Sequence, residues 1–195
     1  MKRAEQIEIV YDSKHWKLFK EIRLKTIRTM ETLDNFHLRS IVHGSIVRGD
    51  VSEMSDIDLY LPEPPSSFSI ETALERSGFQ GYQRTIIQAT PLYALKGYIA
   101  LDHQTSLSFP LVKLRPVEKE FYRFGGAASL SELRKEKRIA GVDKRLMLIE
   151  PTTEGHVETA VVGHEEMVAN LLGVSLNTVL DRVRALIRRD EVGRT

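Results

Sequence analysis

The chain has 195 residues and a formal net charge of +1, and this near-neutral balance provides no global field to attract nucleic acid, so such a contact would need a local basic patch. The absence of cysteine excludes disulfides, thiol nucleophiles and cysteine-bound zinc or iron–sulfur sites. Because no apolar run could cross a membrane and the charged N-terminus lacks a signal core, we expect a cytoplasmic protein without a membrane partner.

The first third of the chain predicts three strands and one long helix. Alternating or β-prone residues predict strands at 5–11, 39–43 and 57–61. Apolar residues at helical spacing predict a helix over 13–33, with basic residues on its other face. The prolines that follow residue 61 end the third strand, because proline cannot donate to a strand ladder.

The middle of the chain predicts a short helix followed by further strands. The turn Asp102-His103-Gln104 separates two β-rich runs, so these runs are expected to form a hairpin. Ser129 and Glu132 fit a capping box that opens another helix. The expected ranges are a helix at 69–77, strands at 82–89, 96–101 and 105–114, a helix at 130–139 and a strand at 145–149.

The last part of the chain differs in character. Helical patterns over 165–172 and 176–189 flank a short turn that contains glycine. The preceding segment, 151–155, is rich in turn residues and favours a boundary. We therefore expect a first domain at 1–155 and a small helical, helix-turn-helix-like C-terminal module at 156–195.

The strongest chemical signal is Gly44-Ser45 followed, after ten residues, by Asp56-Ile57-Asp58. A glycine after a strand lets the backbone turn tightly and approach a ligand, and a serine behind it with free backbone amides can hold phosphate oxygens. Asp56 and Asp58 are two apart on an expected strand, so both carboxylates point to one face, with Cα atoms about 6.6–7 Å apart. Such hard oxygen ligands favour Mg²⁺ or Mn²⁺ over zinc.

These residues resemble a known signature. The stretches Gly44-Ser45-Ile46-Val47-Arg48-Gly49 and Ser55-Asp56-Ile57-Asp58-Leu59 are similar to the motif of the DNA polymerase β-type nucleotidyltransferase superfamily, and the whole chain more loosely resembles an archaeal group of predicted nucleotidyltransferases. The resemblance implies an α/β (α+β) fold with a mixed sheet flanked by helices. It also implies that the Gly44-Ser45 turn binds the triphosphate of a nucleotide and that Asp56 and Asp58 bind the catalytic metals.

Arg48, inside this motif, has two interpretations. Its guanidinium could contact a phosphate of the nucleotide. It could instead form an ion pair with Asp50 or Glu53 close by in the sequence. The sequence alone supports both interpretations equally.

The superfamily usually has a third acidic residue on a later strand, and the sequence offers two alignments for it. Asp102 follows the run 97–101 and is one candidate, although aspartate is also favoured in turns for backbone reasons. The other alignment places Ser108 there, and serine is a poor metal ligand beside carboxylate. In that case the site would transfer slowly, bind a nucleotide without turnover, or use another acid such as Glu150.

The C-terminal helix pair resembles a helix-turn-helix, in which the second helix enters the DNA major groove. Residues 164–195 carry five arginines and five acidic residues, whereas a dedicated DNA reader should show a clear positive footprint. The same pattern also packs helix pairs against a neighbouring domain or in a dimer. The candidate nucleic-acid contacts are Asn177, Thr178, Arg182 and Arg184.

The sequence therefore predicts a metal-dependent nucleotidyltransferase that moves a nucleoside monophosphate from a nucleoside triphosphate to a hydroxyl of an unidentified acceptor, with release of pyrophosphate. The alternative is a nucleotide-sensing, DNA-binding regulator with a degenerate nucleotidyltransferase domain. Mg²⁺ or Mn²⁺ is the expected cofactor. The expected site comprises Gly44, Ser45 and Arg48 for the nucleotide and Asp56, Asp58 and Asp102 for catalysis, with Asp56 and Asp58 on the metal.

Overall fold

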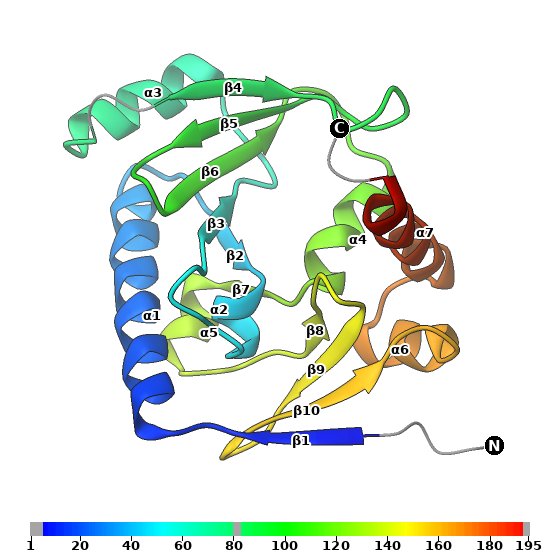
Figure 1. Cartoon of the computed structure of the whole chain (residues 1–195). Helices are drawn as coiled ribbons and strands as arrows, with labels where there is room; N and C mark the ends of the chain where they lie inside the picture. Colours follow the sequence, from blue (N-terminus) through cyan, green and yellow to red (C-terminus); the bar gives the residue numbers. More distant parts are fainter. Residues whose placement is uncertain (1–5, 80–82, 193–195) are drawn as a thin grey trace.

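The computed structural model of the chain describes residues 6–79 and 83–192, and these form two sheets with helices packed against them (Figure 1). The larger sheet is mixed, because β3 and β6 run parallel while its other neighbouring strands run antiparallel. Its strand order is β4 (Arg84–Ile87), β5 (Lys96–Ala100), β6 (Thr105–Pro110), β3 (Ile57–Tyr60), β2 (Ile41–His43) and β7 (Ala127–Ser129).

The smaller sheet is antiparallel and joins the two halves of the chain. Its order is β1 (Gln6–Val10), β10 (Gly155–Ala160), β9 (Met147–Pro151) and β8 (Gly141–Val142). Strand β1 pairs with β10 from Gln6 opposite Thr159 to Val10 opposite Gly155. The expected division between residues 155 and 156 therefore falls inside β10, next to its first residue.

Helices cover both faces of the larger sheet. On one face α1 (Ser13–Asp34), α3 (Ser67–Arg76) and the single turn α5 (Leu130–Arg134) enclose the main apolar core. On the other face lies α4 (Pro116–Phe124) (Figure 1). The centre of its Tyr122 ring lies 3.7 Å from that of Tyr60 of β3, and the two rings are stacked. This confirms the mixed sheet flanked by helices that the sequence predicts.

The C-terminal helix pair is confirmed as α6 (Glu165–Leu172) and α7 (Leu176–Val192). Gly173 ends α6 with φ of 62°, in the left-handed region that favours glycine. The pair does not have a core of its own. Its apolar residues pack with those of β8, β9 and the end of α4 in one cluster that contains Phe124, Val142, Leu148, Val168, Leu172, Val179, Val183 and Leu186.

One helix boundary predicted from the sequence is wrong for a local reason. The helix expected at 130–139 ends at Arg134, because Glu136 has φ of 54° and the Arg23 guanidinium binds the carbonyls of Leu133 and Lys137. Helix α4 and strand β10 were not predicted from the sequence. Residues 5 and 82, at the starts of two expected strands, lie outside the described residues.

Among the described helices, none has the length and apolar composition required to cross a membrane.

Candidate active site

A cleft of about 450 Å³ opens on the face of the larger sheet that is opposite α1. The turn that leads from β2 into α2 (Ser45–Arg48), together with β3, forms one wall, the sheet wall, which carries Gly44, Ser45, Asp56 and Asp58. The turn between β8 and β9 and the inner side of α7 form the other wall, the far wall. The sequence therefore brings its glycine–serine turn and its aspartate pair into one cavity.

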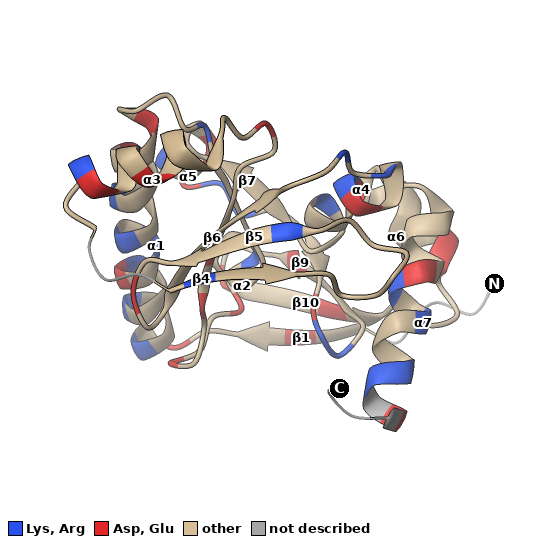
Figure 2. Cartoon of the chain, turned by 90° about the horizontal axis from the view of Figure 1, so that it is seen from above, with Lys and Arg blue, Asp and Glu red and all other residues tan. Residues whose placement is uncertain are grey.

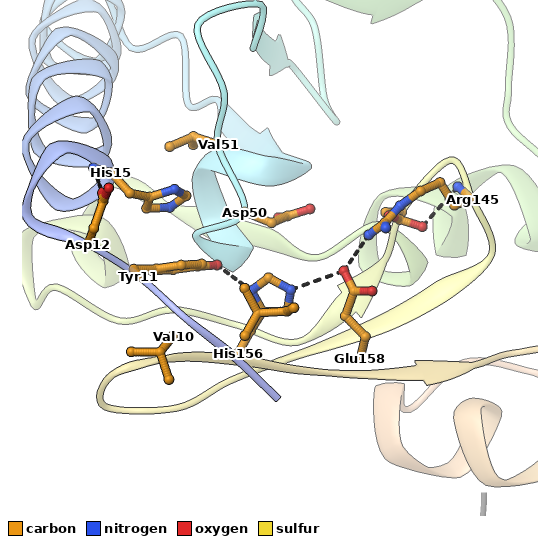
Figure 3. A pocket seen from close by; sticks show the side chains of 11 residues that line it. Val10, Tyr11, Asp12, His15, Asp50, Val51, Arg145, His156 and Glu158 are labelled. Atoms are coloured by element: carbon orange, nitrogen blue, oxygen red, sulfur yellow. Dashed lines mark hydrogen bonds and ion pairs between the residues drawn. The ribbon is translucent and has the colours of Figure 1, made fainter. Parts of the chain in front are cut away.

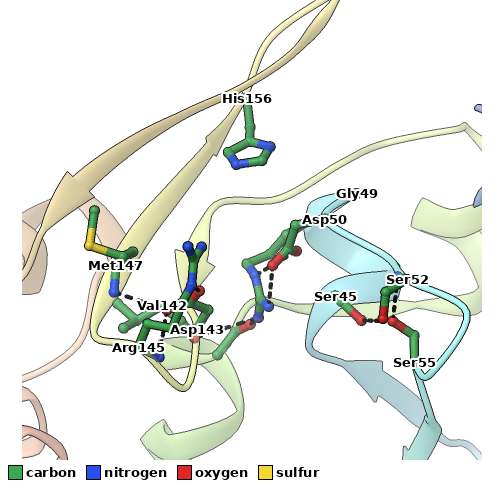
Figure 4. A network of polar contacts seen from close by, with 12 residues as sticks. Ser45, Gly49, Asp50, Ser52, Ser55, Val142, Asp143, Arg145, Met147 and His156 are labelled. Carbon is green, nitrogen blue, oxygen red and sulfur yellow. Dashed lines mark hydrogen bonds and ion pairs between the residues drawn. The ribbon is translucent and has the colours of Figure 1, made fainter. Parts of the chain in front are cut away.

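The Gly44-Ser45 turn leaves its backbone open at Gly44. Gly44 has φ of 91°, which L-amino acids with a side chain rarely adopt, and no atom lies within 4 Å of where its Cβ would be. Ser45 opens α2 (Ser45–Arg48), a single turn, and its hydroxyl donates to the Ser55 hydroxyl at 3.2 Å (Figure 4). Ser55 also accepts the amide of Ser52, so these serines hold the loop that leads to the aspartates.

The two aspartates face the cleft because β3 alternates. Ile57 and Leu59 are fully buried in the main core, so Asp58 projects from the opposite face and Asp56 precedes the strand on that side. Asp58 accepts a hydrogen bond of 3.0 Å from the Ser106 hydroxyl. His43 lies opposite Asp58 on β2, and burial lowers the pKa of this histidine to about 4 against the attraction of Asp58. His43 is therefore neutral near pH 7.

Arg48 forms the ion pair that the sequence offered as an alternative to a phosphate contact. Its side chain is buried, and its guanidinium donates to both carboxylate oxygens of Asp50, at 3.0 and 2.8 Å. A third bond of 2.6 Å reaches the carbonyl of Gly125. Arg48 thus connects α2 to the end of α4, and its hydrogen-bonding capacity is largely used within the protein.

Asp102 lies in the β5–β6 turn and is not among the residues that line the cleft. Its carboxylate accepts the amides of Gln104 and Thr105, each at 2.8 Å, and pairs with Lys25 of α1 at 2.9 Å. Within residues 6–79 and 83–192, no three His, Asp or Glu side chains gather as a metal site. The expected third carboxylate at Asp102 is therefore not brought to the other two.

The parallel register of β3 and β6 shows which residue stands beside Asp58. Ser106 is opposite Asp58, whereas Ser108 is opposite Tyr60 and donates to the carbonyl of Leu59. The register therefore places Ser106, and not Ser108 of the alternative alignment, beside Asp58. Glu150 lies on β9 of the smaller sheet and is not among the cleft residues.

Asp56 and Asp58 suit Mg²⁺ or Mn²⁺. Carboxylate oxygens are the ligands that hard divalent cations prefer, and the chain has no cysteine to offer a thiolate. Mg²⁺ is commonly held by one or two carboxylates, with substrate phosphates and water as its other ligands. A pair of aspartates beside an open glycine–serine turn is therefore a sufficient donor set.

The C-terminal residues proposed to contact nucleic acid divide into two groups. Asn177 and Arg184 are exposed on α7. Thr178 is fully buried and its hydroxyl donates to Glu120 of α4, so it cannot reach a DNA groove. The Arg182 guanidinium lies 4.8 Å from the centre of the Phe121 ring and lines the cleft.

Sequence reasoning missed much of the far wall of the cleft. Lys144 follows β8, and Arg189 lies on the same side of α7 as Arg182, seven residues further on. That spacing of two turns is the sequence signal that could have identified Arg189. Lys144 carries no comparable signal, because its place depends on how the smaller sheet is docked.

A second pocket of about 570 Å³, lined in part by Tyr11 and His156, borders the cleft (Figure 3). The Tyr11 hydroxyl lies 2.5 Å from Nδ1 of His156, and Nε2 of His156 lies 3.1 Å from Glu158. Arg145 pairs with both Glu158 and Asp143. These mutual contacts fix Arg145 where the two cavities meet. Both cavities are lined by Asp50, Asp143 and Arg145.

No family model and no curated protein matches the chain. Among solved structures, 52% of the chain is similar to a cytoplasmic RNA terminal U-transferase, with 18% identity, a TM-score of 0.34 and 30% of that chain covered. The same share is similar to Cid1 in complex with its short product ApU, with 15% identity, a TM-score of 0.31 and 32% coverage. The chain thus spans about a third of the length of these proteins. The function proposed below rests on the site and not on these similarities.

Proposed function

We propose that the chain is a metal-dependent nucleotidyltransferase that transfers a nucleoside monophosphate from a nucleoside triphosphate to a hydroxyl group of its acceptor. The observation that carries this proposal is that Gly44, Ser45, Asp56 and Asp58 meet in one cleft. A close-approach glycine, a serine hydroxyl and paired carboxylates are the groups needed to hold a metal-bound triphosphate.

Each of these residues has a role in positioning. The open side of Gly44 leaves room for phosphate oxygens beside the backbone, and the Ser45 hydroxyl can turn from Ser55 to donate to one of them. Asp56 and Asp58 would hold Mg²⁺ or Mn²⁺, which neutralises charge on the phosphate oxygens. The acceptor hydroxyl would lose its proton to solvent, and its oxygen would bond to the α-phosphorus as the bond to pyrophosphate, in line with it, breaks.

The test of this function is transfer from each of the four α-labelled nucleoside triphosphates with Mg²⁺ or Mn²⁺. RNA, DNA and protein are offered as acceptors, and pyrophosphate release is followed in parallel. We expect label on one acceptor class and an equal amount of pyrophosphate. Nucleotide binding without transfer to any acceptor would contradict the proposal and favour a sensor.

The regulator remains a second candidate because Ser106, and not a carboxylate, stands beside Asp58. The packing of α7 argues against it. Thr178 is buried against α4 and Arg182 lines the cleft, so two of the four residues expected on DNA do not lie on the exposed face of α7. DNA retention that falls with salt and survives loss of both aspartates would support the regulator.

Replacing Ser106 with aspartate provides a direct test of the two-carboxylate site. Ser106→Asp places a third carboxylate beside Asp58, and metal affinity rises with the number of charged ligands. We expect the Mg²⁺ concentration for half-maximal transfer to fall by about tenfold, equivalent to about 1.4 kcal/mol. Ser106→Asn, of similar shape but uncharged, is the control. Equal loss of transfer in both variants would show that the serine itself is needed.

A further inference from the structure

The charged groups of the two cleft walls that form no ion pair within the described residues have opposite signs. Asp56 and Asp58 lie on the sheet wall, and Lys144, Arg182 and Arg189 lie on the far wall. Basic positions recur along α7 toward its C-terminal end (Figure 2). The far wall therefore presents cations to a ligand bound at the sheet wall.

The other cations of the cleft are already paired, and these three are not. Arg48 is bound to Asp50, and Arg145 to Asp143 and Glu158. In the described part of the chain, no ion pair involves Lys144, Arg182 or Arg189. Nε of Arg182 is buried and has no hydrogen-bond partner among the described atoms. Buried polar groups are nearly always hydrogen-bonded, so the Arg182 guanidinium, which lines the cleft, keeps hydrogen-bonding capacity that no described group of the protein uses.

The charge of a triphosphate identifies which anion fits. A nucleoside triphosphate with one divalent metal still has net negative charge, and phosphate oxygens prefer arginine and lysine donors. Since Arg48 is engaged with Asp50 and Gly125, the sheet wall offers no uncommitted cation to the β- and γ-phosphates. The cations available to them from the described lining of the cleft are those of the far wall.

We propose that Lys144, Arg182 and Arg189 form a clamp, the phosphate clamp, that binds the β- and γ-phosphates of the nucleoside triphosphate. This inference rests on the proposed function and assigns part of the nucleotide site to the C-terminal helix pair. Helix α7 is well fixed for this purpose. The Tyr93 hydroxyl binds Asp181, next to Arg182, and Ser175 donates to Glu120 of α4 at 2.7 Å.

The test measures equilibrium binding of inorganic tripolyphosphate, ATP and AMP to the full chain in the presence of Mg²⁺. Tripolyphosphate is useful because it does not depend on base preference. We expect Arg182→Gln/Arg189→Gln to weaken tripolyphosphate and ATP binding by about 10- to 100-fold, because charged hydrogen bonds are lost, and to leave AMP binding nearly unchanged. Lys144→Gln, at an exposed position, should act in the same direction with a smaller effect.

Arg184→Gln/Arg188→Gln is the matched control, because it removes the same charge from exposed positions of α7 that do not line the cleft. Thermal unfolding of every variant checks that α7 stays folded, and Arg182→Lys should recover part of the affinity. Unchanged tripolyphosphate binding in the clamp variant would overturn the inference. So would a loss confined to an RNA or DNA acceptor, which would assign this wall to the acceptor.

The outcomes also separate the clamp from the proposed function. If the wild-type chain transfers nucleotides and the clamp variant binds ATP normally, the clamp alone is wrong. If tripolyphosphate binding depends on the clamp but no acceptor is modified, the clamp stands and transfer fails. A wild-type chain that binds neither ATP nor tripolyphosphate would overturn both.

Discussion

Asp56→Asn and Asp58→Asn are each expected to reduce nucleotide transfer by about 10³-fold or more, because the metal's charge stabilisation is worth several kcal/mol. The fold should be unaffected. Asp56 is exposed, and the hydrogen bond between Asp58 and Ser106 can be kept by an amide oxygen. Label transfer at saturating Mg²⁺ measures the effect, and circular dichroism checks the fold.

Asp102→Asn is the matched control for these two substitutions. The resemblance suggested Asp102 as a catalytic residue, but it lies in the β5–β6 turn, outside the cleft, and pairs with Lys25 of α1. We expect normal transfer and a somewhat lower melting temperature, because a charged cap of the turn is lost. Loss of transfer in Asp102→Asn at full stability would restore Asp102 to the catalytic set. Full transfer in Asp56→Asn would refute the site.

Arg48→Met should destabilise the protein by about 3–5 kcal/mol, because it leaves the largely buried Asp50 carboxylate without its partner. The Gly125 carbonyl loses its donor as well. For a chain of this size the loss corresponds to a melting temperature lower by roughly 6–20 °C. Calorimetry or thermal circular dichroism measures it.

A double variant and a surface pair serve as controls for Arg48. In Arg48→Met/Asp50→Leu no unpaired charge remains, so part of the stability should return. Lys14→Met breaks the exposed pair with Glu53 and should hardly change the melting temperature. If Arg48→Met melted like the wild type but no longer bound ATP, the guanidinium would be a phosphate ligand and not a structural group.

The sheet wall of the cleft could be predicted because the local geometry of a few adjacent residues defines which side chains it presents. Only glycine readily adopts φ of 91° at residue 44, and the alternation of Ile57, Asp58 and Leu59 decides which side chains face the core. Each of these features depends on a few adjacent residues. Local patterns of this kind are visible in a single sequence.

The remaining parts depend on contacts between distant segments. Ser106 stands beside Asp58 only because β3 and β6 pair in parallel after a crossover through α3, β4 and β5, and no local pattern encodes that register. Helix α4 was missed although Pro116 occupies its first turn, which is a known helix start. The far wall was missed because α7 reaches the cleft by packing on α4.

The pairing of β1 with β10 has a consequence for how the chain is made. The larger sheet is formed by residues 41–129, so all its strands have been synthesised well before the smaller sheet is complete. Strand β1 is synthesised before the other described strands. It can pair with its neighbour only after β10, which ends at Ala160, has been synthesised. Pairing over so long a sequence separation raises contact order, so closure of the smaller sheet should be a late and slow event during translation.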